Sequence, residues 1–386
     1  MKIVSVIDTL RVGGPGKVLL TQILSLRDSV ESWKVVTFRR RGVTDSDFSR
    51  ALAAEGIDEI VLEESAIAPL RPVRSLVHLI RDLEPDIVEA HGYKANFFLA
   101  LVTRRSRMDR AWRWVGWVHG YTSENPKILF YNSLERWAVT RADLTVFVSR
   151  SLRKWIRRPL RNWKVVANSV AADYDRNVSG HLNESSSQPW TSESKMILVV
   201  GRYSREKGQD RIPRIAAELS TRRQDFRFLL VGEGPAERHI RFLIKRYKVG
   251  HLVELHPFES NIRPFYRAAT ICVLPSRREG LPNVVLESLA MGCPLVSVDV
   301  GGVKEVVTPG VEALVVPQGD QRALVDAIDT ALDDADLRSE LSAAGRERVR
   351  DSFLCSKRAL KVQGLYRNLL EEKAGIAGTT DLRSDQ

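Results

Sequence analysis

The chain has 386 residues, of which 44% are hydrophobic and 28% charged, a balance that predicts two or three globular domains and excludes a disordered, collagen-like or coiled-coil chain. No run of about 18 apolar residues occurs, and the first apolar run, residues 3–7, is too short for a secretory signal. The net charge is +11, and residues 1–170 carry 28 Lys/Arg and 18 Asp/Glu, a net of +10.

Short apolar runs alternate with amphipathic segments along the chain. In the first half the runs are residues 3–7, 35–38, 86–90, 115–118 and 144–148, and in the second half they are residues 196–200, 226–231, 271–274, 295–298 and 313–316. Most are continuous rather than alternating, which is typical of strands buried on both faces of a parallel sheet. Strands that alternate with helices predict doubly wound α/β domains.

The segment 171–195 interrupts this alternation with a polar stretch rich in Ser, which is the composition of a linker. We therefore expect a first α/β domain over residues 1–170, a hinge over 171–195 and a second α/β domain over 196–351. Residues 374–386 are polar and predict a flexible tail. Two such domains would place a ligand site between them, because open α/β sheets bind ligands beyond the carboxyl ends of their strands.

A glycine-rich loop, Gly13-Gly14-Pro15-Gly16, follows the first predicted strand, and a helix pattern begins at about Lys17. Such a loop lets backbone N–H groups approach a phosphate, and the dipole of the following helix favours the anion. The spacing matches neither the dinucleotide fingerprint nor the P-loop. A tight strand-to-helix turn without a ligand is the alternative.

Two cations, Arg202 and Lys207, follow the first predicted strand of the second half, in a loop bounded by Gly201 and Gly208. A guanidinium offers a planar fork for phosphate oxygens and an ammonium offers a mobile point charge, so the pair could hold a pyrophosphate. Two solvated surface cations are the alternative. No Asp-x-Asp pattern stands at a predicted strand end, so we expect neither a divalent metal nor a cofactor.

Two acids lie near the start of a predicted helix in the second half. Glu279 is in the loop after the run 271–274, and Glu287 is inside the helix predicted from Asn283, its N-cap, to Gly292. Carboxylates placed here could accept hydrogen bonds from sugar hydroxyls, while the helix N-terminus suits phosphate. For Glu287 a solvated position is the alternative, because the periodicity leaves its helix face ambiguous.

Together these motifs resemble those of the GT-B-fold retaining glycosyltransferases of family 4, often called group 1. The resemblance covers nearly the whole chain and is strongest over residues 196–317. The motifs that carry it are the Glu-x7-Glu pair with Glu-Gly-Leu-Pro-Asn (279–283), Gly201-Arg202 with Lys207-Gly208, Val231-Gly232-Glu233-Gly234-Pro235, and Gly301-Gly302 with Glu305. The resemblance implies two Rossmann-like domains that face a central cleft, with a final helix, residues 352–373, that packs back on the first domain.

The resemblance also implies a role for each matching residue on the donor side. Arg202 and Lys207 would hold the donor diphosphate. Glu279 would contact the sugar hydroxyls near the anomeric carbon, and Glu287 would bind the ribose hydroxyls of the nucleotide. Gly14 would close over the diphosphate from the first domain. Backbone amides around Leu281–Asn283 would touch the distal phosphate, and the donor-binding residues of this loop are Gly280, Leu281, Pro282 and Asn283.

On the acceptor side, the resemblance implies that His119 is the active-site histidine. With Glu279, Arg202 and Lys207 it forms the predicted catalytic set. His91 matches the other strand-end histidine of the family and is an acceptor-side candidate, with a purely structural role as the alternative.

The implied activity is transfer of a sugar from a nucleotide-diphosphate sugar, such as a UDP-sugar, to a glycan or lipid-linked acceptor. The family implies retention at the anomeric carbon, and the products would serve polysaccharide, lipopolysaccharide or glycolipid synthesis at the cell surface. Other enzymes on this fold, a nucleotide-sugar epimerase or a sugar phosphorylase, are alternatives. A more distant one is a nucleic-acid-binding protein, but no RNA-binding signature is present and we expect no nucleic acid. No oligomeric state is predicted.

Two stretches concentrate the positive charge of the first half, residues 103–113 and 150–164. The first holds five Arg and one Asp with Trp112, Trp114 and Trp117 at or beyond its end, and the second holds seven Lys/Arg, no acid, Trp155 and Trp163. Cations interleaved with tryptophan suit an anionic membrane interface, single-stranded nucleic acid or a solvated helix face. We favour peripheral contact with an anionic membrane.

The chain has three cysteines and no C-x-x-C pair. This usage predicts a reducing compartment and neither a disulfide framework nor a zinc site. We therefore expect a cytoplasmic protein that contacts the inner face of the cytoplasmic membrane.

Overall fold

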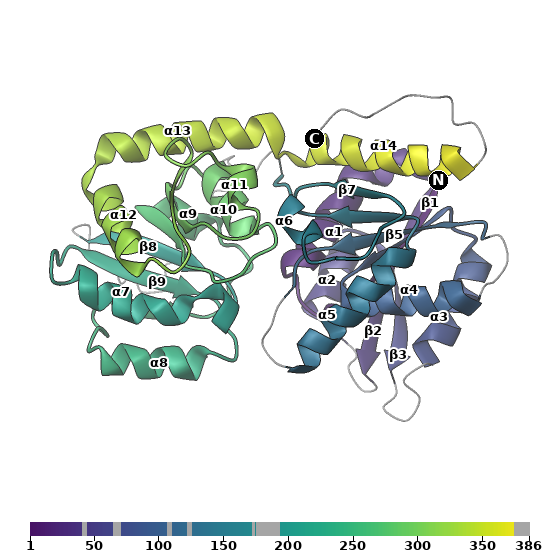
Figure 1. Cartoon of the computed structure of the whole chain (residues 1–386), viewed down its shortest axis with the longest axis horizontal. Helices are drawn as coiled ribbons and strands as arrows, with labels where there is room; N and C mark the ends of the chain where they lie inside the picture. Colours follow the sequence, from purple (N-terminus) through teal and green to yellow (C-terminus); the bar gives the residue numbers. More distant parts are fainter. Residues whose placement is uncertain are drawn as a thin grey trace.

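The computed structural model describes residues 1–40, 45–64, 71–105, 110–121, 126–171, 174 and 194–373. Most of the predicted hinge and the whole predicted tail lie outside these residues. The described chain forms two lobes, each built on a parallel sheet flanked by helices (Figure 1). We call residues 1–171 together with helix α14 (Cys355–Lys373) the N-terminal lobe, and residues 194–352 the C-terminal lobe. The predicted α/β architecture with two parallel sheets is confirmed.

The described part of the N-terminal lobe contains a seven-stranded parallel sheet in the order β3-β2-β1-β4-β5-β6-β7. Its strands are β1 (Lys2–Ile7), β2 (Ser32–Arg40), β3 (Asp58–Glu64), β4 (Ile87–His91), β5 (Arg113–Val118), β6 (Leu144–Phe147) and β7 (Trp163–Val165). Its helices are α1 (Gly14–Leu26), α2 (Asp47–Ala54), α3 (Arg71–Leu83), α4 (Tyr93–Arg105), α5 (Pro126–Ala138) and α6 (Arg150–Arg153). The strand order reverses between β1 and β4, and such a switch point is where doubly wound sheets bind ligands.

The C-terminal lobe repeats this plan, and its described residues form a six-stranded parallel sheet in the order β10-β9-β8-β11-β12-β13. Its strands are β8 (Lys195–Val200), β9 (Phe226–Val231), β10 (Val253–His256), β11 (Ile271–Leu274), β12 (Leu295–Val298) and β13 (Ala313–Val316). Its helices are α7 (Ile212–Leu219), α8 (Glu237–Arg246), α9 (Arg263–Ala268), α10 (Asn283–Ala290), α11 (Val303–Val306), α12 (Gln321–Asp333) and α13 (Ala335–Ser352). The switch point here lies between β8 and β11, which carry the predicted donor-side loops.

Helix α14 leaves the C-terminal lobe and lies along the N-terminal lobe beside α1 (Figure 1). Val362, Tyr366 and Leu369 of α14 are buried in one core with Leu19 and Ile23 of α1. Their spacing of three and four residues places them on one face of the helix. Burial of an aliphatic side chain of this size contributes about 1.5–3 kcal/mol, so α14 is an integral part of the N-terminal lobe.

The tryptophans of the two basic stretches have different surroundings. Trp112, Trp114 and Trp117 are buried, whereas Trp155 and Trp163 are each 42% exposed. The tryptophans of the first stretch pack inward, because β5 is a central strand that pairs with β4 and β6 and is covered on both faces. In the described residues no helix is long and apolar enough to cross a bilayer.

Candidate active site

The structure brings together two of the predicted donor-side residues, Lys207 and Glu279. Lys207 follows β8 and Glu279 follows the neighbouring strand β11, so both stand at the carboxyl edge of the sheet. The Nζ atom of Lys207 lies 3.0 Å and 2.8 Å from the two carboxylate oxygens of Glu279. The hydroxyl of Ser276 donates to the same carboxylate at 2.7 Å. These contacts fix the orientation of Glu279, whose side chain is only 6% exposed.

A tight turn places Lys207 beside the β11 loop. Gly208 has φ +74°, and a Cβ atom there would lie 2.2 Å from the carbonyl oxygen of Pro275, so only glycine fits this close approach of two loops. Arg202 stands at the carboxyl end of β8 and is exposed. Gly201, next to it, packs against the aliphatic stem of Lys207. The two predicted phosphate-binding cations therefore share one loop at the sheet edge.

Glu287 lies on α10 and is 5% exposed, so the alternative of a solvated Glu287 is wrong. Its carboxylate accepts a hydrogen bond from the hydroxyl of Tyr266 at 3.1 Å and another from Nζ of Lys17, which belongs to the N-terminal lobe. Burial, together with the charge of Glu287, raises the pKa of Tyr266 well above its usual value, so this phenol stays protonated and donates. Lys17 and Tyr266 were not among the predicted site residues.

The two strand-end histidines form a pair. His91 ends β4, and His119 follows the adjacent strand β5, so their side chains meet at the carboxyl edge of the N-terminal sheet. Nδ1 of His91 lies 2.9 Å from Nε2 of His119. Burial, together with the electrostatic effect of the neighbouring His91 and Arg358, lowers the pKa of His119 well below its usual value. His119 is therefore neutral near pH 7 and can donate or accept a hydrogen bond without carrying charge.

A buried carboxylate, Glu89, lies next to the histidine pair. Its Oε1 atom lies 3.3 Å from Nε2 of His91, and its carboxylate accepts hydrogen bonds from Ser5, Tyr366 and, at 3.0 Å, Gln22. Burial alone would raise the pKa of Glu89, but His91 and the hydrogen-bond donors outweigh it and hold that pKa below its usual value. Glu89 is thus an ionised group that orients His91, which in turn orients His119.

The lobes contact each other where these groups lie. A Cβ atom added to Gly280 would stand 2.3 Å from the carbonyl oxygen of His119, so the loop that carries Glu279 touches the loop that carries His119. The amide of Asn168 donates to the carbonyl of Leu281 at 2.9 Å and to the side-chain oxygen of Asn283 at 2.8 Å. These contacts join the acceptor-side and donor-side candidates into one interlobe site.

Three further predicted positions complete this description. Gly14 is the first residue of α1 and nothing lies within 4 Å of a Cβ built on it, so the start of that helix is open at this point. Pro282 is the N-cap of α10 and makes no side-chain cap. The expectation that Asn283 caps this helix is therefore wrong, because its side chain bonds Asn168 instead. Leu281, between Gly280 and Pro282, is buried.

A further interlobe contact involves Glu305 of α11. Its carboxylate accepts hydrogen bonds from the hydroxyl of Ser149 at 2.6 Å and from the backbone N–H groups of Arg150 and Ser151 at 2.8 and 3.0 Å. In the described part of the chain, no group of three or more His, Cys, Asp or Glu side chains is arranged to hold a metal ion.

Two facing Rossmann-like lobes with cations, carboxylates and a histidine pair at their junction define a GT-B protein. Family-wide sequence models agree with this class: "Glycosyl transferases group 1" matches residues 182–348, and "Glycosyltransferase Family 4" matches residues 12–174. The chain therefore belongs to the group 1 glycosyltransferases, as the motifs predicted. This membership favours a transferase over the epimerase and phosphorylase alternatives.

Individual relatives support the same family. The chain is 28% identical over 263 residues to alpha-D-kanosaminyltransferase of Streptomyces kanamyceticus, which is 64% of this chain and 68% of the relative. It is 30% identical over 184 residues to LpsB, the lipopolysaccharide core biosynthesis mannosyltransferase of Rhizobium meliloti, which is 46% of this chain and 52% of that relative. The Anabaena protein HepE, solved with UDP and glucose, has a TM-score of 0.81 at 19% identity, over 95% of this chain and 99% of HepE. That likeness shows the fold.

Proposed function

We propose that the protein transfers a sugar from a nucleotide-diphosphate sugar to a glycan or lipid-linked acceptor, with retention at the anomeric carbon. The observation that carries this proposal is the interlobe junction, where Lys207 and Glu279 stand next to the loop of His119. Cations suited to a diphosphate and carboxylates suited to sugar hydroxyls come from one lobe, and a neutral histidine comes from the other. A uridine nucleotide is our first candidate donor, since the HepE structure holds UDP.

In this proposal the leaving diphosphate is stabilised by Arg202, Lys207 and the backbone N–H groups of Gly280, Leu281 and Asn283. Fixed positive groups act most strongly where negative charge develops, and an interlobe site that excludes water increases their effect. Glu279 orients the sugar hydroxyls, Glu287 binds the ribose, and Gly14 closes over the diphosphate from the N-terminal lobe. The chemistry asks for no metal ion and no cofactor.

A thermal-shift panel of nucleoside diphosphates tests the donor assignment, because a ligand that binds only the folded chain raises its melting temperature. We expect one nucleoside diphosphate to stabilise the protein selectively, with an equal shift in EDTA. No shift with any diphosphate would contradict the proposal, and a shift that EDTA abolishes would contradict its metal-independent part. Retention is checked on the product, from the proton NMR coupling constant of the new anomeric centre.

The protein also contacts an anionic membrane surface in this proposal, through residues 150–164. This stretch has seven Lys/Arg and no acid, and its Trp155 and Trp163 are half-exposed. Near an anionic surface each basic residue contributes about 1 kcal/mol, and the attraction is screened by salt. In flotation with vesicles we expect binding to phosphatidylglycerol at low salt that is lost at high salt. Equal binding to neutral phosphatidylcholine vesicles would contradict this.

A further inference from the structure

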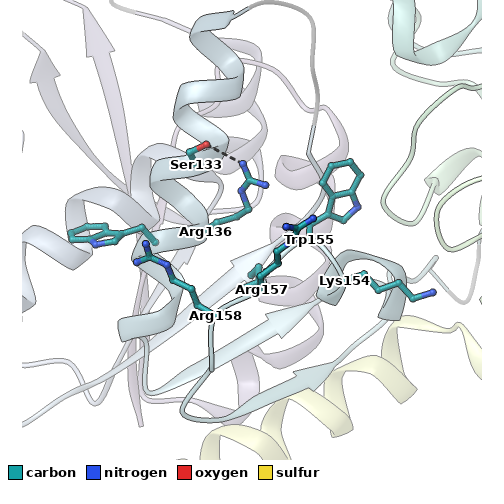
Figure 2. Close-up of a pocket in the computed structure, with 8 residues that line it drawn as sticks. Ser133, Arg136, Lys154, Trp155, Arg157 and Arg158 are labelled. Atoms are coloured by element: carbon teal, nitrogen blue, oxygen red, sulfur yellow. Dashed lines mark hydrogen bonds between the residues drawn. The ribbon is translucent and has the colours of Figure 1, made fainter.

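A pocket of about 400 Å³ lies on the N-terminal lobe between α5 and the segment that follows α6 (Figure 2). Its main lining side chains are cationic or aromatic, and they are Arg136, Lys154, Arg157, Arg158, Trp137 and Trp155. We call it the α5 pocket. It shares no residue with the predicted donor site. In Figure 2 the Lys154 side chain points away from the three arginines, so the positive charge of the α5 pocket comes from these arginines.

The positive charge of the α5 pocket is not neutralised by nearby acids. Within the described residues, Arg157 and Arg158 form no ion pair. The nearest acid to Arg136 along the chain is Glu135, and burial raises the pKa of Glu135 to about 8, so it is mostly uncharged at pH 7. Burial and the charge of Arg158 together lower the pKa of Arg141, another cation of this surface. A cluster of like charges without counter-ions favours an anionic ligand.

The pocket borders the interlobe junction through Trp155. The guanidinium carbon of Arg278, in the C-terminal lobe, lies 5.0 Å from the centre of the Trp155 ring, a cation–π contact across the lobes. Arg278 immediately precedes Glu279. A molecule in the α5 pocket would therefore lie beside the loop that holds the proposed sugar-binding carboxylate.

Tyr121 connects the same pocket to the acceptor-side histidine. It follows His119 by two residues, its ring lies 6.2 Å from that of Trp155, and the guanidinium of Arg136 lies 5.9 Å from its ring centre. Tyr121 is buried, yet its hydroxyl has no hydrogen-bond partner in the described structure. A buried hydroxyl without a partner, on a ring that contacts Arg136, is typical of a site that a polar ligand completes.

We propose that the α5 pocket binds a phosphate group of the acceptor, which makes the acceptor an anionic molecule; this rests on the proposed transferase function. A site with three guanidinium groups suits a phosphate ligand better than a ligand with one carboxylate. Each guanidinium offers a planar fork of donors, and a phosphate monoester carries about 1.5 to 2 negative charges. The phosphate then lies beside Trp155, and the acceptor chain reaches His119 past Tyr121. The phosphate can belong to a lipid headgroup or to a soluble phosphorylated glycan.

Inorganic pyrophosphate is the probe, titrated by calorimetry into protein saturated with UDP so that the donor site is occupied, in about 0.15 M salt. We expect the Arg157→Gln/Arg158→Gln variant to bind it at least about tenfold more weakly than the wild type. The matched control is Lys245→Gln/Arg246→Gln, which removes two adjacent exposed cations from α8 of the other lobe. Equal weakening in both variants, or no pyrophosphate binding by the UDP-saturated wild type, overturns the proposal.

Vesicles of phosphatidylglycerol and phosphatidylcholine in a 30:70 mixture identify the source of the phosphate. A headgroup source predicts that the Arg157→Gln/Arg158→Gln variant loses vesicle binding and that pyrophosphate displaces the wild type from vesicles. A soluble source predicts weaker pyrophosphate binding by the variant, while pyrophosphate does not displace the wild type from vesicles. Both results support the pocket. Thermal stabilisation by UDP is measured in parallel on the wild type and both variants. If UDP stabilises none of these proteins, the donor assignment fails. The difference in pyrophosphate affinity between the two variants still tests whether the α5 pocket binds phosphate.

Discussion

Lys207 and Glu279 hold each other in an ion pair, although each was expected to contact a different part of the donor. The two expectations are compatible, because a diphosphate carries more negative charge than one carboxylate and would compete for the same ammonium group. Lys207 would then turn toward the phosphate while Glu279, still held by Ser276, remains for the sugar hydroxyls. The ion pair keeps both groups oriented at the sheet edge.

Replacing Lys207 with alanine removes this ammonium group. We expect Lys207→Ala to lower kcat about 100- to 1000-fold at saturating donor, the range that follows the loss of one charge-stabilising donor. Far-UV circular dichroism should be unchanged, because Lys207 packs on the loop surface. Lys245→Ala on α8 is the matched control and should keep full activity. Unchanged turnover in purified Lys207→Ala would contradict the diphosphate assignment.

Glu89 is a second residue whose effect can be measured. In the Glu89→Gln variant His91 loses its buried carboxylate partner, and breaking such a pair costs about 3 kcal/mol of unfolding free energy. Urea denaturation at pH 7 measures this difference. The activity of this variant should fall as well, because Glu89 orients His91 and His91 in turn contacts His119. If Glu89 served only for packing, the substitution would leave the pH profile of kcat unchanged.

The destabilisation of Glu89→Gln should depend on pH in one direction. The pKa of Glu89 is lower in the folded than in the unfolded chain, so the ionised group stabilises the fold above its unfolded pKa, which is about 4.3. That contribution is lost as the pH falls through the folded value. The wild-type and Glu89→Gln stabilities should therefore converge below about pH 4. A gap between them that does not shrink as the pH falls below about 4 would argue against an ionised Glu89.

At the scale of elements, all the central strands were predictable, whereas of the four edge strands of the two sheets only β13 was. Ten apolar runs correspond to strands of the two sheets, because a strand covered by helices on both faces must be apolar along its length. The strands that the sequence pattern missed are β3, β7 and β10, and each is at the edge of its sheet. Edge strands are partly exposed, so β3 has acidic residues at both ends of a short apolar run and β7 is mostly exposed.

The candidate site was predictable only where a motif lies within one loop. Glu279, Lys207 and His119 each follow a strand, and the strand order then brings them to the junction. Lys17 and Tyr266 were missed because each contacts Glu287 from a distant part of the chain. No local pattern records such a contact, since its partners are set by how the lobes pack.

Helix α14 contributes a side chain to the support of the histidine pair, and this can be tested with Tyr366→Phe. The hydroxyl of Tyr366 donates to Glu89 and accepts from the indole N–H of Trp117 at 3.2 Å. Without this hydroxyl, Glu89 and Trp117 each lose a hydrogen bond. We therefore expect the free energy of unfolding, measured by urea denaturation, to fall by about 1–3 kcal/mol. Tyr247→Phe on the exposed end of α8 is the control. Because Tyr366 and Glu89 are in contact, the effects of Tyr366→Phe and Glu89→Gln should not add.

At the scale of the whole molecule, Gly280 controls how closely the lobes approach. Gly280→Ala would place a Cβ atom 2.3 Å from the carbonyl oxygen of His119, so the lobes must move apart. We expect a larger radius of gyration by small-angle X-ray scattering and a strong fall in transfer, while stabilisation by a nucleoside diphosphate persists. In many enzymes the lobes close when substrate binds, and this closure completes the active site.

The control for this variant is Gly364→Ala on α14, where nothing lies within 4 Å of the added Cβ. It should leave both the scattering and the activity unchanged. If Gly280→Ala also leaves both unchanged, the contact between the two loops has no part in the reaction.

Helix α14 has a consequence for how the protein is made. Its buried face is translated after the C-terminal lobe, yet it covers the core of the N-terminal lobe, most of which is translated first. Until residues 355–373 leave the ribosome, Leu19, Ile23 and the ionised Glu89 lack their cover, so the N-terminal lobe stays incomplete. A fragment that stops after residue 170 should therefore be aggregation-prone, and supplying α14 as a separate peptide should rescue it.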